Sequence, residues 1–496
     1  MSDNPVSEPD VSAERPISEH WVWAGGHRPA VPRALVEAMT THWGPTPVTQ
    51  EVHPSAAQTA ARRARLGAAM PGITLVIPTG TAKVRANDTD YRFRPGTDLF
   101  YLTGCVEPDC VLVITPGAAS GHATLYVPER RDARTHAFFT DSRYGELWVG
   151  ARRGVVEAAQ YYQIDTAPLE DLAKHLGELR DTKMAVVRGF DAAVDAALEP
   201  SDNDTRLATT LSELRLVKDE FEQRQLEVAI AHTIEGFADV VRALPQAIGR
   251  SERVIEGVFN LRARVEGNDV GYDTIAASGA NATVLHWTRN DGAVRNGDLL
   301  LLDAGVECDQ LYTADVTRTL PINGVFSPAQ RRIYELVLAA QEAGIAAVAP
   351  GVPFSAAHDA AVRVLAYGLA ELGIIDDPEA SLRPDRQTHR RYTLHGVSHM
   401  LGLDVHDCAN ARNDVYRGEL HAGYVLTVEP GLYFQANDLT VPEEYRGIGV
   451  RIEDDILVTE TGSRNLSGAL ARDPDAIEAW MAEQWRRAAP DLGLLG

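Results

Sequence analysis

Acidic residues at the ends of apolar, strand-like segments restrict what the second half of this chain can fold into. Leu299-Leu300-Leu301-Leu302 reads as a buried strand and runs directly into Asp303, and the β-branched segment Tyr312–Leu320 contains Asp315. A hairpin centred on Asp309 would place the two aspartates opposite each other, where like charges are destabilising unless they share a proton or hold a cation. The pair therefore indicates a metal site. The alternative is a register shifted by one residue, with one aspartate in solvent.

Two further carboxylates follow the same pattern later in the chain. Glu429 ends an apolar segment and precedes a Pro-Gly turn, although alone it is equally compatible with an ordinary strand end. A strand predicted over Gly449–Val458 places Arg451, Glu453 and Asp455 on one face by alternation. Apolar neighbours predict that Glu453 is buried and needs a partner. An edge strand with a solvated charged face is the alternative reading.

Histidines accompany these carboxylates. His395, His399 and His406 lie within 12 positions of an apolar segment, and two glycines in that segment argue against one regular helix. A fourth histidine, His286, follows Val284-Leu285. Without further context it is more simply read as an ordinary histidine at a strand end, whereas the cluster of three favours a site.

Together, oxygen-rich donors with one imidazole suit Mn²⁺, Fe²⁺, Co²⁺ or Zn²⁺. Four carboxylates exceed the charge of one divalent ion, so we expect two ions, ~3.5–4 Å apart, with a shared hydroxide as nucleophile. The chain contains no HExxH, GxSxG or Walker A motif, which removes the commonest competing chemistries.

The overall charge limits the partners. The 496 residues include 47 Lys and Arg against 70 Asp and Glu, a formal net charge of −23. Such a chain lacks the basic footprint of a nucleic-acid binder and is not attracted to anionic lipid. Four cysteines without a CxxC pair favour a reducing compartment. No apolar run approaches the ~18 residues of a membrane span, and the acidic N-terminus is unlike a secretory signal. We therefore expect a cytoplasmic protein.

The length and the alternation of strands with helices predict an α/β chain with two domains after an extension. Residues 1–50 form the extension, with about the first 20 disordered; residues 51–215 form a mixed α/β domain, and residues 216–496 a second α/β domain. The strands expected in the first domain are Ile73–Pro78, Cys110–Thr115 and Thr124–Val127. In the second, Ser327 followed by Pro328 predicts the start of a helix.

Five ordered motifs in the second domain resemble the pita-bread metallopeptidases, and most closely their aminopeptidase P (Xaa-Pro aminopeptidase) branch. The motifs are Leu302-Asp303-Ala304-Gly305, Ala314-Asp315-Val316-Thr317-Arg318-Thr319, the segment 395–407, Thr427–Tyr433 and Gly447–Asp455. The resemblance is strong over residues 216–470. In the first domain it rests on the segment 94–104 and on Glu107-Pro108. It implies a mixed α/β domain followed by a pita-bread catalytic domain.

The resemblance also implies a role for each matching residue. The implied metal ligands of two divalent ions, usually manganese, are Asp303, Asp315, His399, Glu429 and Glu453. The implied catalytic residues are His286, His406 and the proton-shuttling Glu429. The implied substrate-binding residues are His395, Tyr433 and Arg451. The spacing from Asp303 to Asp315 is one residue longer than in many members, and we place the extra residue in the turn.

The activity implied is release of the N-terminal residue from peptides with proline in second position, by attack of a metal-bridging hydroxide. Related enzymes are often homodimers or homotetramers. Prolidase, which cleaves Xaa-Pro dipeptides on the same fold, stays open, because Arg451 or His406 could fix the dipeptide carboxylate. A metal-free peptide-binding module is a further alternative, although such relatives lose some of the five ligands and this chain has ligand-competent residues at all five.

Overall fold

The computed structural model describes residues 21–22, 31–44, 51–87, 89–117 and 122–487. The disorder predicted for residues 1–20 lies outside this part of the chain. The chain divides into two compact units, Met1–Asp204 and Thr205–Gly496. The division lies near the start of helix α9 (Asp202–Leu216).

A five-stranded mixed sheet with the strand order β8-β7-β6-β3-β9 forms the centre of the first unit. Its strands are β3 (Thr74–Pro78), β6 (Val111–Thr115), β7 (His122–Val127), β8 (Asp165–Pro168) and β9 (Met184–Val186). The outer pairs β7–β8 and β3–β9 are parallel, and the central pairs are antiparallel. The three strands expected from the sequence are confirmed as β3, β6 and β7.

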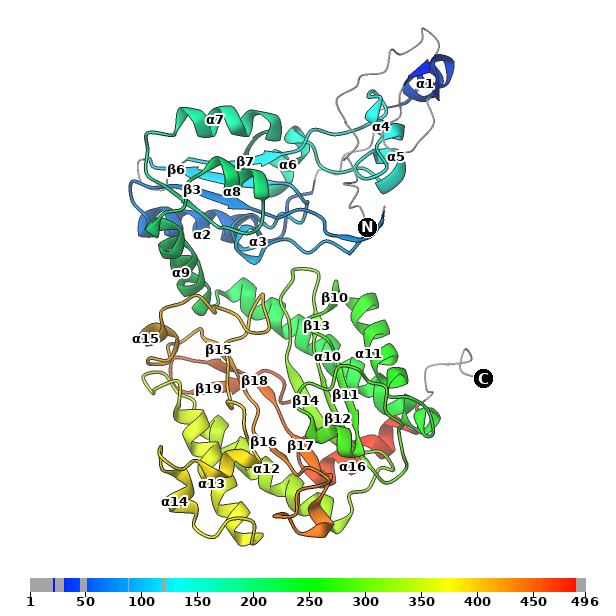
Figure 1. Cartoon of the computed structure of the whole chain (residues 1–496), viewed down its shortest axis with the longest axis vertical. Helices are drawn as coiled ribbons and strands as arrows, with labels where there is room; N and C mark the ends of the chain where they lie inside the picture. Colours follow the sequence, from blue (N-terminus) through cyan, green and yellow to red (C-terminus); the bar gives the residue numbers. More distant parts are fainter. Residues whose placement is uncertain (1–20, 23–30, 45–50, 88, 118–121, 488–496) are drawn as a thin grey trace, which may run out of the picture. The chain divides into compact units, whose positions relative to one another are not determined.

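Helices cover both faces of this sheet, which explains why every residue of β3 is buried. Figure 1 shows α2 and α3 on one side and α7 on the other. The helices of the unit are α1 (Arg33–Thr40), α2 (Ala56–Ala69), α3 (Thr97–Thr103), α4 (Ala137–Thr140), α5 (Glu146–Val149), α6 (Val155–Tyr162), α7 (Leu172–Glu178) and α8 (Ala192–Ala197), with the short η1 (Leu169–Asp171). The small pairs β1–β2 (Trp21–Val22, Val31–Pro32) and β4–β5 (Val84–Ala86, Thr89–Asp90) complete it.

Two three-stranded antiparallel sheets form the centre of the second unit. Their strand orders are β11-β12-β14 and β15-β18-β19, and two-stranded pairs β10–β13 and β16–β17 accompany them. The strands are β10 (Asp269–Val270), β11 (Ile275–Ser278), β12 (Leu299–Ala304), β13 (Val306–Glu307), β14 (Val316–Pro321), β15 (Val425–Val428), β16 (Gly431–Tyr433), β17 (Gly449–Arg451), β18 (Asp454–Val458) and β19 (Ser463–Asn465). Together with the helices below, this is the mixed α/β catalytic fold expected from the motifs.

The helices of this unit pack in two pairs, α10 with α11 and α12 with α13, which flank the strands in Figure 1. Capping boxes start two of them: Asp219 with Glu222 at α10, and Ser327 with Gln330 at α12, where Pro328 is the first residue as predicted. The bounds are α10 (Glu220–Ala247), α11 (Arg253–Glu266), α12 (Pro328–Ala346), α13 (Ala356–Glu371), α14 (Pro378–Leu382), α15 (Asn413–Tyr416) and α16 (Pro474–Gln484), with η2 (Gly279–Thr283), η3 (Thr388–Arg391) and η4 (Glu443–Tyr445).

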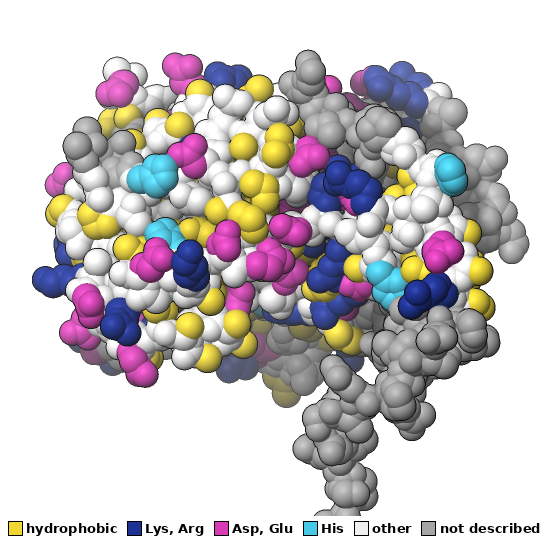
Figure 2. Space-filling model, turned by 90° about the horizontal axis from the view of Figure 1, so that it is seen from above, with side chains coloured by type: hydrophobic (Ala, Val, Ile, Leu, Met, Phe, Trp, Pro, Cys, Tyr) yellow, Lys and Arg dark blue, Asp and Glu magenta, His cyan; other side chains and the backbone are white. Residues whose placement is uncertain are grey.

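The surface carries side chains of both charges. Figure 2 shows one face, on which acidic, basic and apolar side chains are interspersed. Among the described residues, no helix combines the length and apolar character needed to cross a membrane.

The register predicted for the hairpin between the two aspartates is wrong. Asp303 pairs with Thr317 in the ladder of β12 and β14, so the hairpin is centred on Gln310 rather than on residue 309. The observed pairing differs from the predicted one by two positions. The turn contains Leu311 in the left-handed region, with φ of 60°. Asp315 precedes β14 and therefore lies diagonally from Asp303 rather than opposite it.

The single strand predicted over Gly449–Val458 is also wrong, because it is divided into β17 and β18, which belong to different sheets. Glu453 lies between them, and its backbone N–H donates to the Thr317 carbonyl at 3.1 Å instead of continuing a ladder. The face is not solvated: Arg451, Glu453 and Asp455 are all buried.

Candidate metal centre

The two aspartates meet at a tyrosine. Asp303 ends the buried strand β12, and Asp315 lies just before β14. The hydroxyl of Tyr272 lies 2.7 Å from Asp303 Oδ1 and 2.6 Å from Asp315 Oδ1. A hydroxyl has one proton to donate, so it cannot satisfy two carboxylates at once. Burial, followed by the charges of Asp303, Asp315 and Glu453, raises the pKa of Tyr272 well above its ordinary value, so the hydroxyl keeps its proton.

Three of the predicted ligands converge closely enough for one cation. Ligand atoms of Asp315, His399 and Glu453 all lie within 4.8 Å of one another. His399 Nε2 is 3.2 Å from Asp315 Oδ2 and 3.6 Å from Glu429 Oε1. The other ring nitrogen, Nδ1, lies 3.2 Å from the Met400 carbonyl and donates to it, which directs Nε2 toward the carboxylates. The structure thus brings all five predicted ligands into one cluster.

The electrostatics of the cluster favour the binding of cations. Burial, and then repulsion from neighbouring carboxylates, raises the pKa of Glu453 well above its ordinary value. Burial also raises the pKa of Asp303, and it raises the pKa of Glu429 to about 7. Burial lowers the pKa of His399, but Asp315 and Glu429 outweigh this and raise it to about 9. Protons neutralise these groups where no cation does, so the donor set fits divalent metal ions.

Arg451 compensates part of this negative charge. Its Nη2 donates to Asp303 Oδ2 at 2.5 Å, and its Nη1 donates to the Tyr433 hydroxyl at 3.0 Å. Its Nε donates to Thr317 Oγ1 at 3.2 Å, and that hydroxyl donates to Glu453 Oε2 at 2.7 Å. Arg451 therefore orients two of the predicted ligands, one directly and one through Thr317.

The predicted substrate-side residues lie around the cluster. His395 Nε2 is 2.7 Å from the Tyr433 hydroxyl, and His395 Nδ1 is 2.7 Å from the Gly396 carbonyl. Burial, and then the charge of Arg451, lowers the pKa of His395 to about 4, so the ring is neutral at pH 7. The rings of His399 and His406 are 4.4 Å apart edge to face. His406 and His286 are both exposed, as groups that meet a substrate must be.

A buried glutamate that sequence reasoning missed holds the loop of His286. Glu252 accepts from the backbone N–H of Ser278 at 2.7 Å and of Gly292 at 2.8 Å. It also accepts from Asn281 Nδ2 at 2.9 Å and from Trp287 Nε1 at 2.7 Å. Four donors on one fully buried carboxylate fix residues 278–292 at the N-cap of α11. No local pattern marks Glu252, because its partners lie 26–40 residues away.

A second buried acid fixes the segment of His406. The neighbouring Asp407 accepts from Arg215 Nε at 3.0 Å, and Lys218 Nζ lies 3.6 Å from its other oxygen. Burial raises the pKa of Asp407, but Arg215 and Lys218 outweigh this and lower it. The loop of His286 is thus anchored by Glu252, and the segment of His406 by Asp407.

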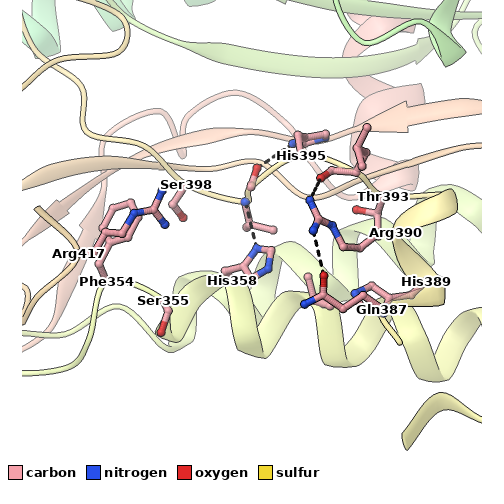
Figure 3. A pocket seen from close by; sticks show the side chains of 14 residues that line it. Phe354, Ser355, His358, Gln387, His389, Arg390, Thr393, His395, Ser398 and Arg417 are labelled. Carbon is pink, nitrogen blue, oxygen red and sulfur yellow. Dashed lines mark hydrogen bonds between the residues drawn. The ribbon is translucent and has the colours of Figure 1, made fainter. Parts of the chain in front are cut away.

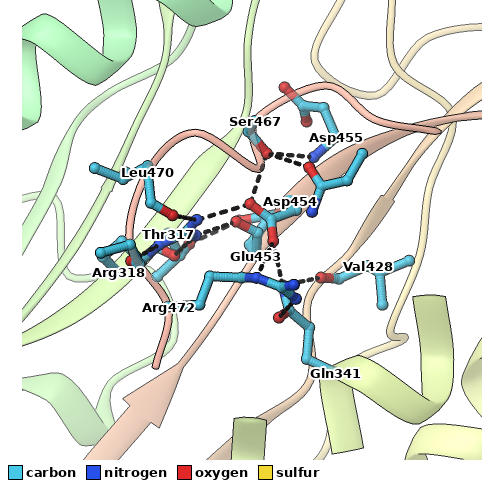
Figure 4. A network of polar contacts seen from close by, with 12 residues as sticks. Thr317, Arg318, Gln341, Val428, Glu453, Asp454, Asp455, Ser467, Leu470 and Arg472 are labelled. Atoms are coloured by element: carbon cyan, nitrogen blue, oxygen red, sulfur yellow. Dashed lines mark hydrogen bonds and ion pairs between the residues drawn. The ribbon is translucent and has the colours of Figure 1, made fainter. Parts of the chain in front are cut away.

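An ion pair behind the cluster ties both sheets together (Figure 4). Arg318 and Asp454, both with 0% side-chain exposure, are 2.8 Å apart. Arg318 also donates to the carbonyls of Thr317 at 2.9 Å, Glu453 at 2.6 Å and Leu470 at 3.0 Å. This network fixes the backbone of Glu453, which lies outside any ladder.

Known proteins match the chain over nearly its whole length. Residues 224–460 match Metallopeptidase family M24, and residues 59–187 match the family described as Aminopeptidase P, N-terminal domain. The Xaa-Pro aminopeptidase 1 of Streptomyces coelicolor is 53% identical over 97% of this chain and 98% of its own length. A Pseudomonas aeruginosa aminopeptidase PepP structure has a TM-score of 0.79 at 32% identity, covering 88% of this chain and 100% of that one. A zinc-substituted Escherichia coli aminopeptidase P with product has a TM-score of 0.77 at 33% identity, covering 87% and 99%.

Proposed function

The chain belongs to metallopeptidase family M24 and has Xaa-Pro aminopeptidase activity, and we propose that it acts with two divalent metal ions, most simply Mn²⁺. The proposed ligands are Asp303, Asp315, His399, Glu429 and Glu453. The observation that carries this proposal is the convergence of the Asp315 and Glu453 carboxylates on the His399 imidazole, with ligand atoms within 4.8 Å of one another. Oxygen-rich donors with one nitrogen suit manganese, although zinc and cobalt accept the same set.

When bound, the metal ions would polarise the scissile carbonyl and provide a hydroxide nucleophile at neutral pH. Glu429 is proposed to move the proton. Its carboxylate would take a proton from the attacking water and return it to the proline nitrogen, a poor leaving group until it is protonated.

The exposed histidines are proposed to hold the substrate. The N–H groups of His286 and His406 would donate to the carbonyl oxygen as negative charge develops on it, and donors of this kind contribute ~3–4 kcal/mol to transition-state stabilisation. His395, Tyr433 and Arg451 are proposed to line the side of the proline ring. The hydrogen bonds among these three side chains favour a rigid wall rather than an adaptable one.

The decisive experiment is a peptide-length series with added Mn²⁺. Gly-Pro, Xaa-Pro-Xaa and longer peptides would be compared, with a peptide lacking proline in second position and an N-acetylated peptide as controls. We expect hydrolysis of Xaa-Pro-Xaa and longer peptides with a free amine. Cleavage of the dipeptide alone would favour the prolidase alternative and contradict this proposal.

Metal content tests the ligands separately from the specificity. The purified chain would be stripped with chelator and analysed for bound metal before and after addition of Mn²⁺, Zn²⁺ or Co²⁺. We expect two equivalents to bind to the wild type and fewer to Asp315→Ala. Undiminished activity in the Asp315→Ala variant and in the metal-free chain would favour a role without metal.

The oligomeric state and the cellular location of the protein are also proposed. We propose a homodimer or homotetramer, and support it with the exposed apolar side chains of Leu147, Trp148 and Val149 on α5. A cytoplasmic location is proposed from the four cysteines, which are all free thiols in the structure. Light scattering on the purified protein tests the oligomeric state. Fractionation of the source cells tests the location.

A further inference from the structure

A hollow lies beside the segment that carries His395 and His399. Its volume is about 330 Å³, at the lower end of the ~300–1,000 Å³ that ligand sites occupy. The start of α13, the residues around η3 and the segment 393–398 form its walls (Figure 3). It is therefore next to the predicted site, yet none of the proposed metal ligands lines it.

The lining is cationic. Arg390 and Arg417 line the cavity, and none of the described residues in its wall is Asp or Glu. Burial lowers the pKa values of the lining histidines His358, His389 and His395, so they are neutral and add no positive charge at pH 7. In the described part of the chain, no carboxylate lies within ion-pair distance of the Arg417 guanidinium. The cavity thus has an excess of two positive charges, which selects an anion.

Hydrogen-bond donors accompany the charge. The backbone N–H of Val397 donates to His358 Nδ1 at 3.3 Å, so the proton of this neutral ring is on Nε2 and is available as a donor. The Ser398 hydroxyl is buried and has no hydrogen-bond partner among the described residues. Figure 3 shows Ser398 and Arg417 at the same end of the cavity. A buried hydroxyl without a partner among the described residues, in a wall that also contains an arginine, fits a ligand that accepts hydrogen bonds.

His395 forms a wall common to the cavity and to the catalytic cluster. Its ring bonds to Tyr433, and its Nδ1 is 3.5 Å from Glu429 Oε2, while the same residue lines the cavity. A proline held against His395 would place the carboxylate of the next residue about 7 Å further on, since an extended chain spans ~3.3–3.6 Å per residue. A subsite for this carboxylate must therefore lie within about this distance of His395, and His395 itself lines the cavity.

We propose that this cavity binds the C-terminal carboxylate of short Xaa-Pro-Yaa substrates, with Arg417 as the charged contact and Ser398 and His358 as donors. The proposal rests on the Xaa-Pro aminopeptidase activity and assigns the subsite that recognises the far end of the peptide. An acidic side chain in the third position would offer the same chemistry, so the test must separate the two sources.

The test compares KM for a tripeptide acid, the same tripeptide as C-terminal amide, and an amide with Glu in third position. Because one charge-assisted hydrogen bond is worth about a tenfold change in binding, we expect KM of the acid to be ~10-fold below that of the amide. Arg417→Gln should abolish this difference by raising KM of the acid ~10-fold, with kcat unchanged. The matched control is Arg386→Gln, an exposed arginine of the same region that does not line the cavity.

Equal KM values for acid and amide in the wild type would overturn the proposal, and so would an Arg417→Gln variant that raises both alike. A low KM for the Glu-containing amide alone would show that the cavity recognises a side-chain carboxylate and not the C-terminal one. This result would also contradict the proposal. The amide stays a substrate throughout. Failure of the subsite is therefore distinguishable from failure of the peptidase activity, in which neither peptide is cleaved.

Discussion

The Thr317 hydroxyl donates to Glu453 Oε2 at 2.7 Å, and it accepts from Arg451 Nε at 3.2 Å. Thr317 lies on β14, and Glu453 lies between β17 and β18. These three strands belong to three different sheets, so the bond links one sheet to the connection between the other two. Since partners of this kind orient the side chain that binds the metal, their loss typically costs 10–100-fold in metal affinity.

We predict that Thr317→Val binds metal ~10–100-fold more weakly than the wild type, because valine keeps the shape of threonine and removes only the hydroxyl. Metal titration of the stripped variant, followed by calorimetry and by recovery of activity, measures the change. Thr317→Ser is the control, since it keeps the hydroxyl and should retain affinity. Similar affinities for the Val and Ser variants would show that the hydroxyl does not orient Glu453.

The buried carboxylate of Glu252 leads to a different prediction. Glu252→Gln replaces one oxygen, which accepts two donors, by an amide that can accept none. We expect a loss of about 2–4 kcal/mol of stability from the donors left unpaired, and a fall in kcat/KM of at least tenfold, because the loop of His286 loses its anchor.

Thermal unfolding and steady-state kinetics at saturating metal measure both effects of Glu252→Gln. The matched control is Glu256→Gln, one turn further along α11, where the side chain is only partly buried. If Glu252→Gln lowers the melting temperature but leaves kcat/KM unchanged, the glutamate stabilises the fold without positioning His286.

The residues of the cluster were predictable because their signal is local. An apolar strand that ends in a carboxylate, as at Asp303 and Glu429, can be read from a few neighbouring residues. The apolar neighbours of Glu453 correctly predicted its burial as well. Their roles as ligands stay predictions until metal is measured.

The geometry was less predictable because long-range contacts determine it. The turn of the hairpin contains Leu311 in the left-handed conformation, a non-glycine residue that no turn pattern marks. The break before β18 depends on the bond from the Glu453 backbone to Thr317, 136 residues earlier. Tyr272 and Glu252 were missed for the same reason, since their partners are distant in the sequence.

The ion pair of Arg318 with Asp454 gives a prediction on stability. Lysine has one ammonium group and cannot reproduce the contacts of the Arg318 guanidinium with Asp454 and with four backbone carbonyls. We expect Arg318→Lys to lose about 3–5 kcal/mol, the usual cost of breaking a buried pair. Urea unfolding monitors this loss. Arg464→Lys, whose exposed pair with Glu227 is 2.7 Å long, is the control and should change stability by less than ~1 kcal/mol.

His53 in the first unit predicts a dependence of stability on pH. Its side chain is 6% exposed, and burial, followed by the charge of Arg153, lowers its pKa to about 4. The unfolded chain, with a histidine pKa of ~6.5, then binds the proton more readily than the folded chain below pH 6.5. The stabilisation is present above pH 6.5 and is lost as the pH falls toward 4, by about 2 kcal/mol between pH 7 and pH 5.

Urea unfolding of the wild type at these two pH values should show the loss. His53→Gln should lack this part of the slope, whereas replacement of the exposed His122 by Gln should keep it. An equally steep slope in His53→Gln would assign the pH dependence to other groups.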